Sequence, residues 1–82
     1  MYNRHTMVMT KFAGQISKRL GSKVVELRRE REWTQQQLAA ATGIDQGWVS
    51  RIEAGRVEPC LGTLGLLANA FDLSLSDLLK GV

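Results

Sequence analysis

Two helix-start signals that stand close together constrain the fold of this chain more than any other feature. In the stretch WTQQQLAAATGIDQGWVS, Thr34 and Gln37 have the spacing of a capping box, and Asp45 is a second N-cap residue. Gly43, the usual residue at a helix stop, comes just before Asp45. Two short helices joined by so tight a turn cannot lie antiparallel, so they cross at a steep angle. The stretch therefore predicts a helix-turn-helix.

Helical periodicity also precedes this stretch. Apolar residues at spacings of three and four predict a helix over about residues 16–31. They are Phe12, Ile16, Leu20, Val24 and Leu27. Thr10 is a candidate cap for a longer helix, and residues 1–9 are expected to form a mobile tail. Residues 1–15 are thus either an N-terminal tail or a helix extension, and residues 16–82 are the expected domain.

Two more amphipathic segments follow the helix-turn-helix. One spans residues 61–71, and the next begins after Ser74, a good N-cap residue. Their apolar positions are Leu61, Leu64, Leu67, Ala68, Phe71, Leu75, Leu78 and Leu79. The sequence has no strand pattern and no internal repeat. The prediction is an all-α domain of five helices around one small core.

The net charge of +3 is unevenly distributed. Residues 1–56 hold ten Lys or Arg against five Asp or Glu, and residues 57–82 hold one Lys against three acids, which gives +5 and −2. A basic N-terminal part suits a polyanion partner, although a solvated surface produces the same charge pattern. The run RREREW, with Arg29 and Arg31, is expected to be a solvated helix face.

The scarcity of reactive side chains excludes several classes of protein. One Cys and one His can form neither an intrachain disulfide framework nor an ordinary protein-only zinc site. No acid–base pair or nucleophile with a base is visible, so we expect no enzyme activity, no metal and no cofactor. No apolar run is long enough for a signal peptide or a membrane span, which predicts a cytoplasmic protein without a membrane partner.

The predicted third helix, residues 45–54, has an outer face that is nearly free of bulk. At 100° per residue, Val49 and Ile52 mark its buried direction. The residues on or beside the opposite face are Gln46, Gly47, Trp48, Ser50 and Arg51. A helix of this kind can enter the DNA major groove, where Arg pairs with guanine and Gln with adenine.

Two residues of this helix leave alternatives open. Gly47 lets the helix backbone approach the base edges, or it is simply tolerated in a first turn. Trp48 lies between core and groove, where it either anchors the helix or sets its indole N–H on a phosphate.

From Leu20 to Leu79 the chain resembles the Cro/C1-type (XRE-like) helix-turn-helix family of phage repressors and small bacterial regulators. The matching segments are WTQQQLAAATGI, WVSRIEAGRVEP and TLGLLANAFDLSLSDLL. The resemblance implies a lambda-repressor-like five-helix fold that reads DNA through residues 45–54.

The resemblance also implies roles for single residues. Gln35 matches a glutamine that touches the DNA backbone and braces a glutamine of the recognition helix, and Arg56 is placed for a phosphate. The positions implied in DNA binding are Gln35, Gln46, Gly47, Trp48, Ser50, Arg51 and Arg56. Arg28 and Glu53 match a structural ion pair. Cys60 stands where the family commonly has a Ser helix cap, and a thiol caps poorly.

These features predict a sequence-specific DNA-binding transcriptional regulator. We expect a dimeric repressor or controller protein that reads a two-fold symmetric site in double-stranded DNA. The expected dimer surface consists of Leu73, Leu75, Leu79 and Val82. The alternative is an antitoxin or antirepressor-type interaction module on the same fold. Such a module would use an exposed Trp48 and the C-terminal leucines to bind a protein partner.

Overall fold

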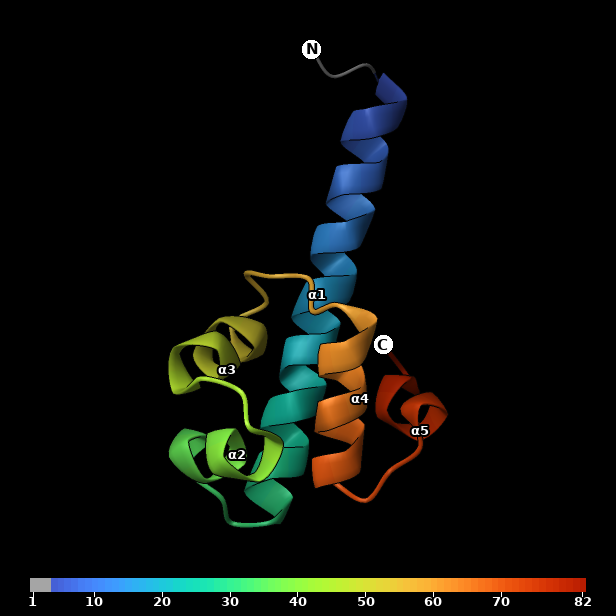
Figure 1. The fold of residues 1–82 in the computed structure, drawn as a ribbon. Helices are drawn as coiled ribbons and strands as arrows, with labels where there is room; N and C mark the ends of the chain where they lie inside the picture. The colour runs from blue at the N-terminus through green and yellow to red at the C-terminus, as the bar shows by residue number, and fades with distance from the viewer. Residues whose placement is uncertain (1–3) are drawn as a thin grey trace.

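The computed structural model describes residues 4–82, with side chains from residue 11 onward, and this part of the chain contains five helices joined by turns and loops. They are α1 (Arg4–Glu30), α2 (Gln35–Thr42), α3 (Gln46–Glu53), α4 (Leu61–Ala70) and α5 (Leu75–Leu79). No strand occurs in this part of the chain. The predicted all-α, five-helix fold is confirmed. Figure 1 shows α2 and α3 on one side of α1, with α4 and α5 on the other.

α1 is much longer than the apolar spacing predicts. It begins at Arg4, so residues 4–9, for which we expected a mobile tail, are helical. Residues 1–3 lie outside the described part of the chain. Because no proline occurs in α1, nothing in its sequence stops the helix toward the N-terminus. α1 therefore projects beyond the other helices (Figure 1), and the molecule measures 43 × 25 × 20 Å.

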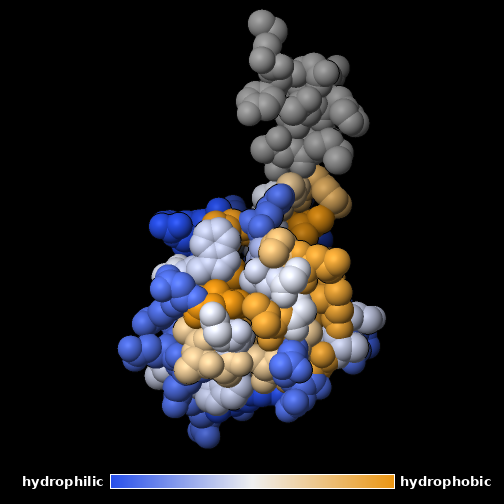
Figure 2. Space-filling model, in the orientation of Figure 1, coloured by the Kyte–Doolittle hydropathy of each residue, from blue (hydrophilic) through white to orange (hydrophobic). Residues whose placement is uncertain are grey.

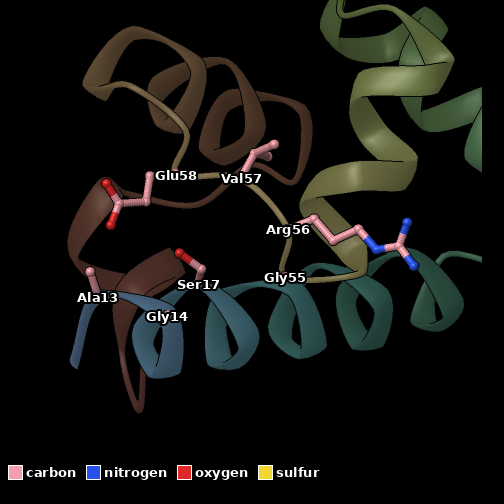
Figure 3. A pocket seen from close by; sticks show the side chains of 7 residues that line it. All are labelled: Ala13, Gly14, Ser17, Gly55, Arg56, Val57 and Glu58. Atoms are coloured by element: carbon pink, nitrogen blue, oxygen red, sulfur yellow. The ribbon is translucent and has the colours of Figure 1, made fainter. Parts of the chain in front are cut away.

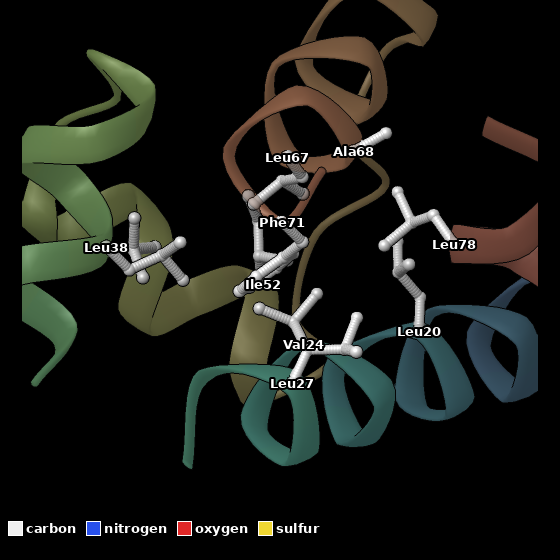
Figure 4. Packing of buried hydrophobic residues seen from close by; sticks show 10 residues of the cluster. Leu20, Val24, Leu27, Leu38, Ile52, Leu67, Ala68, Phe71 and Leu78 are labelled. Atoms are coloured by element: carbon white, nitrogen blue, oxygen red, sulfur yellow. The ribbon is translucent and has the colours of Figure 1, made fainter. Parts of the chain in front are cut away.

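One small core lies between the five helices (Figure 4). Its buried members are Leu20, Val24, Leu27, Leu38, Val49, Ile52, Leu67, Ala68, Phe71 and Leu78. The apolar stripe of α1 extends further than this core. Ile16 is only partly buried, and Phe12 has 56% of its surface exposed. The first two residues of the predicted stripe thus lie at or beyond the edge of the core.

Two glycines let α3 sit directly on the backbone of α1. A Cβ added to Gly21 would lie 2.5 Å from the backbone oxygens of Ile52 and Glu53, far inside van der Waals contact. Gly55 has φ +72°, and a Cβ there would lie 2.8 Å from the Cα of Lys18. The C-terminal end of α3 is therefore fixed against α1, which sets the angle at which α3 is presented.

Side chains cap the starts of α2, α3 and α5 as predicted, and the start of α4 has no such cap, which was also predicted. Thr34 Oγ1 accepts from the backbone N–H of Gln37 at 3.1 Å, and Gln37 Oε1 accepts from the backbone N–H of Thr34 at 2.7 Å. This reciprocal pair is the predicted capping box. Asp45 Oδ2 caps α3 and Ser74 Oγ caps α5. Cys60, at the start of α4, makes no side-chain cap hydrogen bond.

Candidate nucleic-acid interface

The outer face of α3 carries the side chains that sequence reasoning placed there. Gln46, Gly47, Ser50 and Arg51 are exposed, while Val49 and Ile52 on the opposite side are buried in the core. Residues of α3 therefore divide cleanly between a packed face and a free one. The free face presents the hydrogen-bonding groups of Gln46, Ser50 and Arg51 around Gly47, which has no side chain.

The space beside Gly47 is already in use by the helix cap. Asp45 Oδ2 accepts from the backbone N–H of Trp48 at 3.3 Å. A Cβ added to Gly47 would lie 2.9 Å from that same Oδ2 atom. Gly47 thus leaves room for the cap carboxylate as well as for a close approach of the helix backbone to a ligand. The first of these reasons is a contact that sequence reasoning missed.

Trp48 is partly buried and packs against the core cluster. The indole therefore anchors α3 to the domain, and only part of its surface remains free beside the outer face. This position does not match the exposed tryptophan that an interaction module would need. Trp48 therefore has less free surface than the interaction-module alternative assumes.

An ion pair between Arg28 of α1 and Glu53 of α3 joins these two helices. Arg28 Nε and one terminal nitrogen donate to the two carboxylate oxygens of Glu53 at 2.7 and 3.1 Å, and both side chains are largely buried. The other terminal nitrogen donates to the backbone oxygen of Trp33 at 2.8 Å. The hydrogen bonds to Glu53 raise the pKa of Arg28 above its ordinary value and outweigh the opposing effect of burial. The predicted pair is thus a bidentate one.

Gln35 joins this pair from the first turn of α2. Its Nε2 donates to Glu53 Oε1 at 3.0 Å, so its amide nitrogen is directed at the ion pair and not at Gln46. The side chain is partly exposed. Gln35 therefore links α2 to α3 within the domain, a contact that the resemblance did not imply.

Arg56 lies in the loop that leaves α3 and is exposed. Figure 3 shows its side chain pointing away from a shallow hollow of about 560 Å³ between α1 and this loop. Glu58 lies at the other end of the hollow, beside Ala13 (Figure 3). The cation and the acid of the loop are thus held apart, which leaves the Arg56 guanidinium free for an anion.

The residues of the expected dimer surface serve the core as well. Leu73, Leu75, Leu79 and Val82 are all partly buried and pack against the core cluster. Each therefore leaves only part of its surface for another molecule. Among the residues described, no group of three or more His, Cys, Asp or Glu is placed to hold a metal ion. None of the described helices combines the length and apolarity that a bilayer crossing requires.

Comparison with known proteins decides the family. The sequence model of a helix-turn-helix family matches residues 24–78, which include α2, α3 and α4 entirely. The chain belongs to this helix-turn-helix family. The match confirms the resemblance predicted from the sequence, and it begins well inside α1.

Relatives of this helix-turn-helix protein are regulators by name. It is 38% identical over 64 residues to the HTH-type transcriptional regulator DdrOP3 of Deinococcus deserti, covering 78% of the present chain and 50% of that one. It is 39% identical over 61 residues to the uncharacterized HTH-type transcriptional regulator y4dJ of Sinorhizobium fredii, covering 74% and 79%. The chain thus spans half the length of the Deinococcus regulator.

A solved structure with the same fold is the restriction-modification controller protein C.AhdI from Aeromonas hydrophila. The two chains are 29% identical with a TM-score of 0.73. The likeness covers 94% of the controller protein but 76% of the present chain. About a quarter of the present chain thus lies outside the likeness.

Proposed function

We propose that this protein is a sequence-specific transcriptional regulator that binds double-stranded DNA through the outer face of α3. Gln46, Ser50 and Arg51 would contact base edges, with the backbone at Gly47 close to them. Gln35 and Arg56 would contact phosphates, which position the domain without reading sequence. The observation that carries the proposal is the free polar face of α3, held by a packed opposite face in a chain of this family.

The proposed functional unit is a cytoplasmic homodimer without enzyme activity or cofactor. One domain of this size contacts few base pairs, so specific DNA binding requires two copies of the domain on a two-fold symmetric site. Half-sites would lie about one helical turn, roughly 10 base pairs, apart. The likeness to the restriction-modification controller protein C.AhdI supports a repressor or controller role.

The decisive experiment is selection of bound sequences from a random DNA pool, followed by binding measurements on the selected site. Arg51→Ala should lose about 1 to 3 kcal/mol of binding free energy and relax the preference at one base pair. Arg29→Ala, which removes an exposed cation at the end of α1, is the control and should bind as the wild type does. A pool that yields no preferred sequence contradicts the proposal.

Arg56→Ala should behave differently from Arg51→Ala. A phosphate contact carries no sequence information, so the loss should be equal for selected and random DNA. The slope of log affinity against log salt should also become shallower by about one. If Arg56→Ala relaxed base preference instead, the assignment of contacts in the exit loop would be wrong.

A further inference from the structure

The projecting part of α1 carries apolar surface that the domain does not cover. Leu20 and Val24 are buried, Ile16 is partly buried, and Phe12 is 56% exposed. The family match begins at residue 24, so this part of the stripe lies outside the matched region. An apolar stripe that continues past the core of its own domain indicates a surface that another molecule covers.

A groove of about 520 Å³ has the exposed Phe12 as one of its lining residues. Its walls come from the projecting part of α1, from Leu64 of α4 and from Leu79 and Val82 at the C-terminal end. Among its lining residues the only charged one is Glu58, next to Pro59 in the exit loop. Figure 2 shows hydrophobic surface directly below the grey atoms and continuing down over the α4 side. The groove is thus apolar with an acidic edge.

The opposite edge of this surface is basic. A neighbouring hollow shares Val82 with the groove, and its charged lining residues are four cations, Lys18, Arg19, Lys23 and Lys80, and one acid, Glu26. Arg19 follows Phe12 by seven residues, which places the two on the same side of α1. One continuous surface therefore combines a projecting apolar helix, an apolar groove, a basic edge and an acidic edge.

We propose that this surface is an interface between two copies of the chain, in which the projecting α1 of each copy lies in the groove of the other. A two-fold contact requires a patch that is complementary to itself, because residue i of one copy meets residue j of the other and the reverse. The ridge with Phe12 matches the groove, and the Arg19 edge matches the Glu58 edge. A different partner would have to supply both features, which this chain already has.

The interface extends the dimer surface of the proposed function and rests on that proposal. Leu79 and Val82 belong to both the groove and the expected dimer surface. A stable interface buries about 800 Å² on each partner. Four side chains that already pack against their own core offer only part of such an area. The projecting helix supplies the remainder, with Phe12 as its aromatic anchor.

Sedimentation equilibrium of the full chain tests the interface. Phe12→Glu should raise the dimer Kd by at least about tenfold, the effect of losing one good anchor. Leu66→Glu is the matched control, because Leu66 is a large exposed residue of α4 that does not line the groove. It should leave the Kd within about threefold of the wild type. Circular dichroism should show both variants folded, since neither side chain belongs to the buried core.

A charge exchange tests the register of the two copies. Glu58→Arg or Arg19→Glu alone should weaken the dimer, because each places like charges together across the interface. The two substitutions in one chain should restore dimerisation in part, since every repulsive pair becomes an attractive one. Failure of this rescue, with both single variants weakened, would contradict the proposed pairing of edges.

The remaining outcomes separate this inference from the proposed function. A Phe12→Glu chain that dimerises as the wild type does, and still prefers the selected DNA, overturns the interface and leaves the regulator standing. Weaker binding of Phe12→Glu to an isolated half-site would place the stripe on DNA and also overturn it. A wild-type chain that stays monomeric with and without its DNA site overturns both this interface and the homodimer of the proposed function, but not the reading of DNA by α3.

Discussion

α3 and α4 are both short helices on the surface of one domain, yet they are held in different ways. α3 has a side-chain cap from Asp45, and the ion pair of Arg28 and Glu53 fixes it to α1. α4 follows Cys60, which gives it no side-chain cap, and its sequence LGTLGLLANA carries no charge. The exposed face of α3 is polar, whereas α4 exposes 70% of Leu61 and 46% of Leu66.

This difference indicates which partner each side of the molecule can meet. DNA recognition needs a polar face that keeps its position without help, because base contacts depend on geometry. α3 has such a face, and its supports lie within the domain. The groove between the end of α1 and Leu64 of α4 instead presents apolar surface that gains stability only when a protein covers it. The two sides are therefore suited to different partners, nucleic acid and protein.

The largest expected effect tests the support of α3. Arg28→Ala should lower the free energy of unfolding by about 3 to 5 kcal/mol, because it leaves Glu53 as an uncompensated, largely buried charge. Urea unfolding followed by circular dichroism measures the change. Arg29→Ala removes an exposed neighbour in the same helix turn and should change stability by no more than about 0.5 kcal/mol. Equal effects of the two substitutions would show that the pair does not hold α3.

The second effect tests the close contact of α1 with α3. Gly21→Ala places a Cβ against the backbone oxygens of Ile52 and Glu53, which cannot move without moving α3. We expect a loss of about 1 to 3 kcal/mol despite the better helix propensity of Ala.

Gly14→Ala is the internal control for this contact, because a Cβ there meets nothing within 4 Å in the same helix. It should gain up to about 1 kcal/mol, again by urea unfolding. If both alanines were stabilising, α3 would not lie as close to α1 as the structure has it.

Local signals allowed much of the fold to be predicted from sequence. The capping box at Thr34, the cap at Asp45 and the stop at Gly43 depend on residues a few positions apart, and all three are present. The ion pair of Arg28 and Glu53 followed from the family resemblance and not from local pattern. The division of α3 into a buried and an exposed face followed from helical periodicity alone.

Contacts between distant residues could not be read in this way. Arg31, expected on a solvated face, donates to the backbone oxygen of Phe71 and lies over the rings of Trp33 and Phe71. Nothing near Arg31 in the sequence marks that partner. The need for glycine at position 21 likewise could not be predicted, because the backbone that lies against Gly21 belongs to α3. The length of α1 was missed because no stop signal exists to read.

The third effect compares the uncapped start of α4 with the capped start of α5. Cys60→Ser should stabilise the domain by up to about 1 kcal/mol, because a hydroxyl can cap the free N–H groups of α4 where the thiol does not. Ser74→Ala should do the opposite at α5 by about the same amount, since Ser74 Oγ accepts from the backbone N–H of Asp77 at 3.0 Å. Thermal unfolding of the two variants shows whether each substitution raises or lowers the stability of the domain. No gain from Cys60→Ser would mean that the start of α4 is satisfied in another way.

The smallest expected effect concerns Gly47. Helix propensity alone predicts that Gly47→Ala stabilises the protein by up to about 1 kcal/mol. The new Cβ would lie 2.9 Å from Asp45 Oδ2, however, so the carboxylate must shift and its hydrogen bond to the N–H of Trp48 weakens. Because a whole N-cap is worth about 0.5 to 2 kcal/mol, a weakened one should cancel part of the gain in helix propensity. Gly65→Ala in α4, where a Cβ meets nothing within 4 Å, should show the propensity gain undiminished.

A double-mutant cycle isolates this competition. In an Asp45→Ala background the cap is already absent, so Gly47→Ala has no carboxylate to displace and should stabilise as much as Gly65→Ala does. The coupling between positions 45 and 47, measured by urea unfolding, should then equal the difference in stability gain between Gly65→Ala and Gly47→Ala, both in the wild-type background. A Gly47→Ala variant that is fully stabilising in the wild-type background would show that the cap tolerates a side chain. In that case only the close approach of α3 to DNA would remain as a reason for glycine at this position.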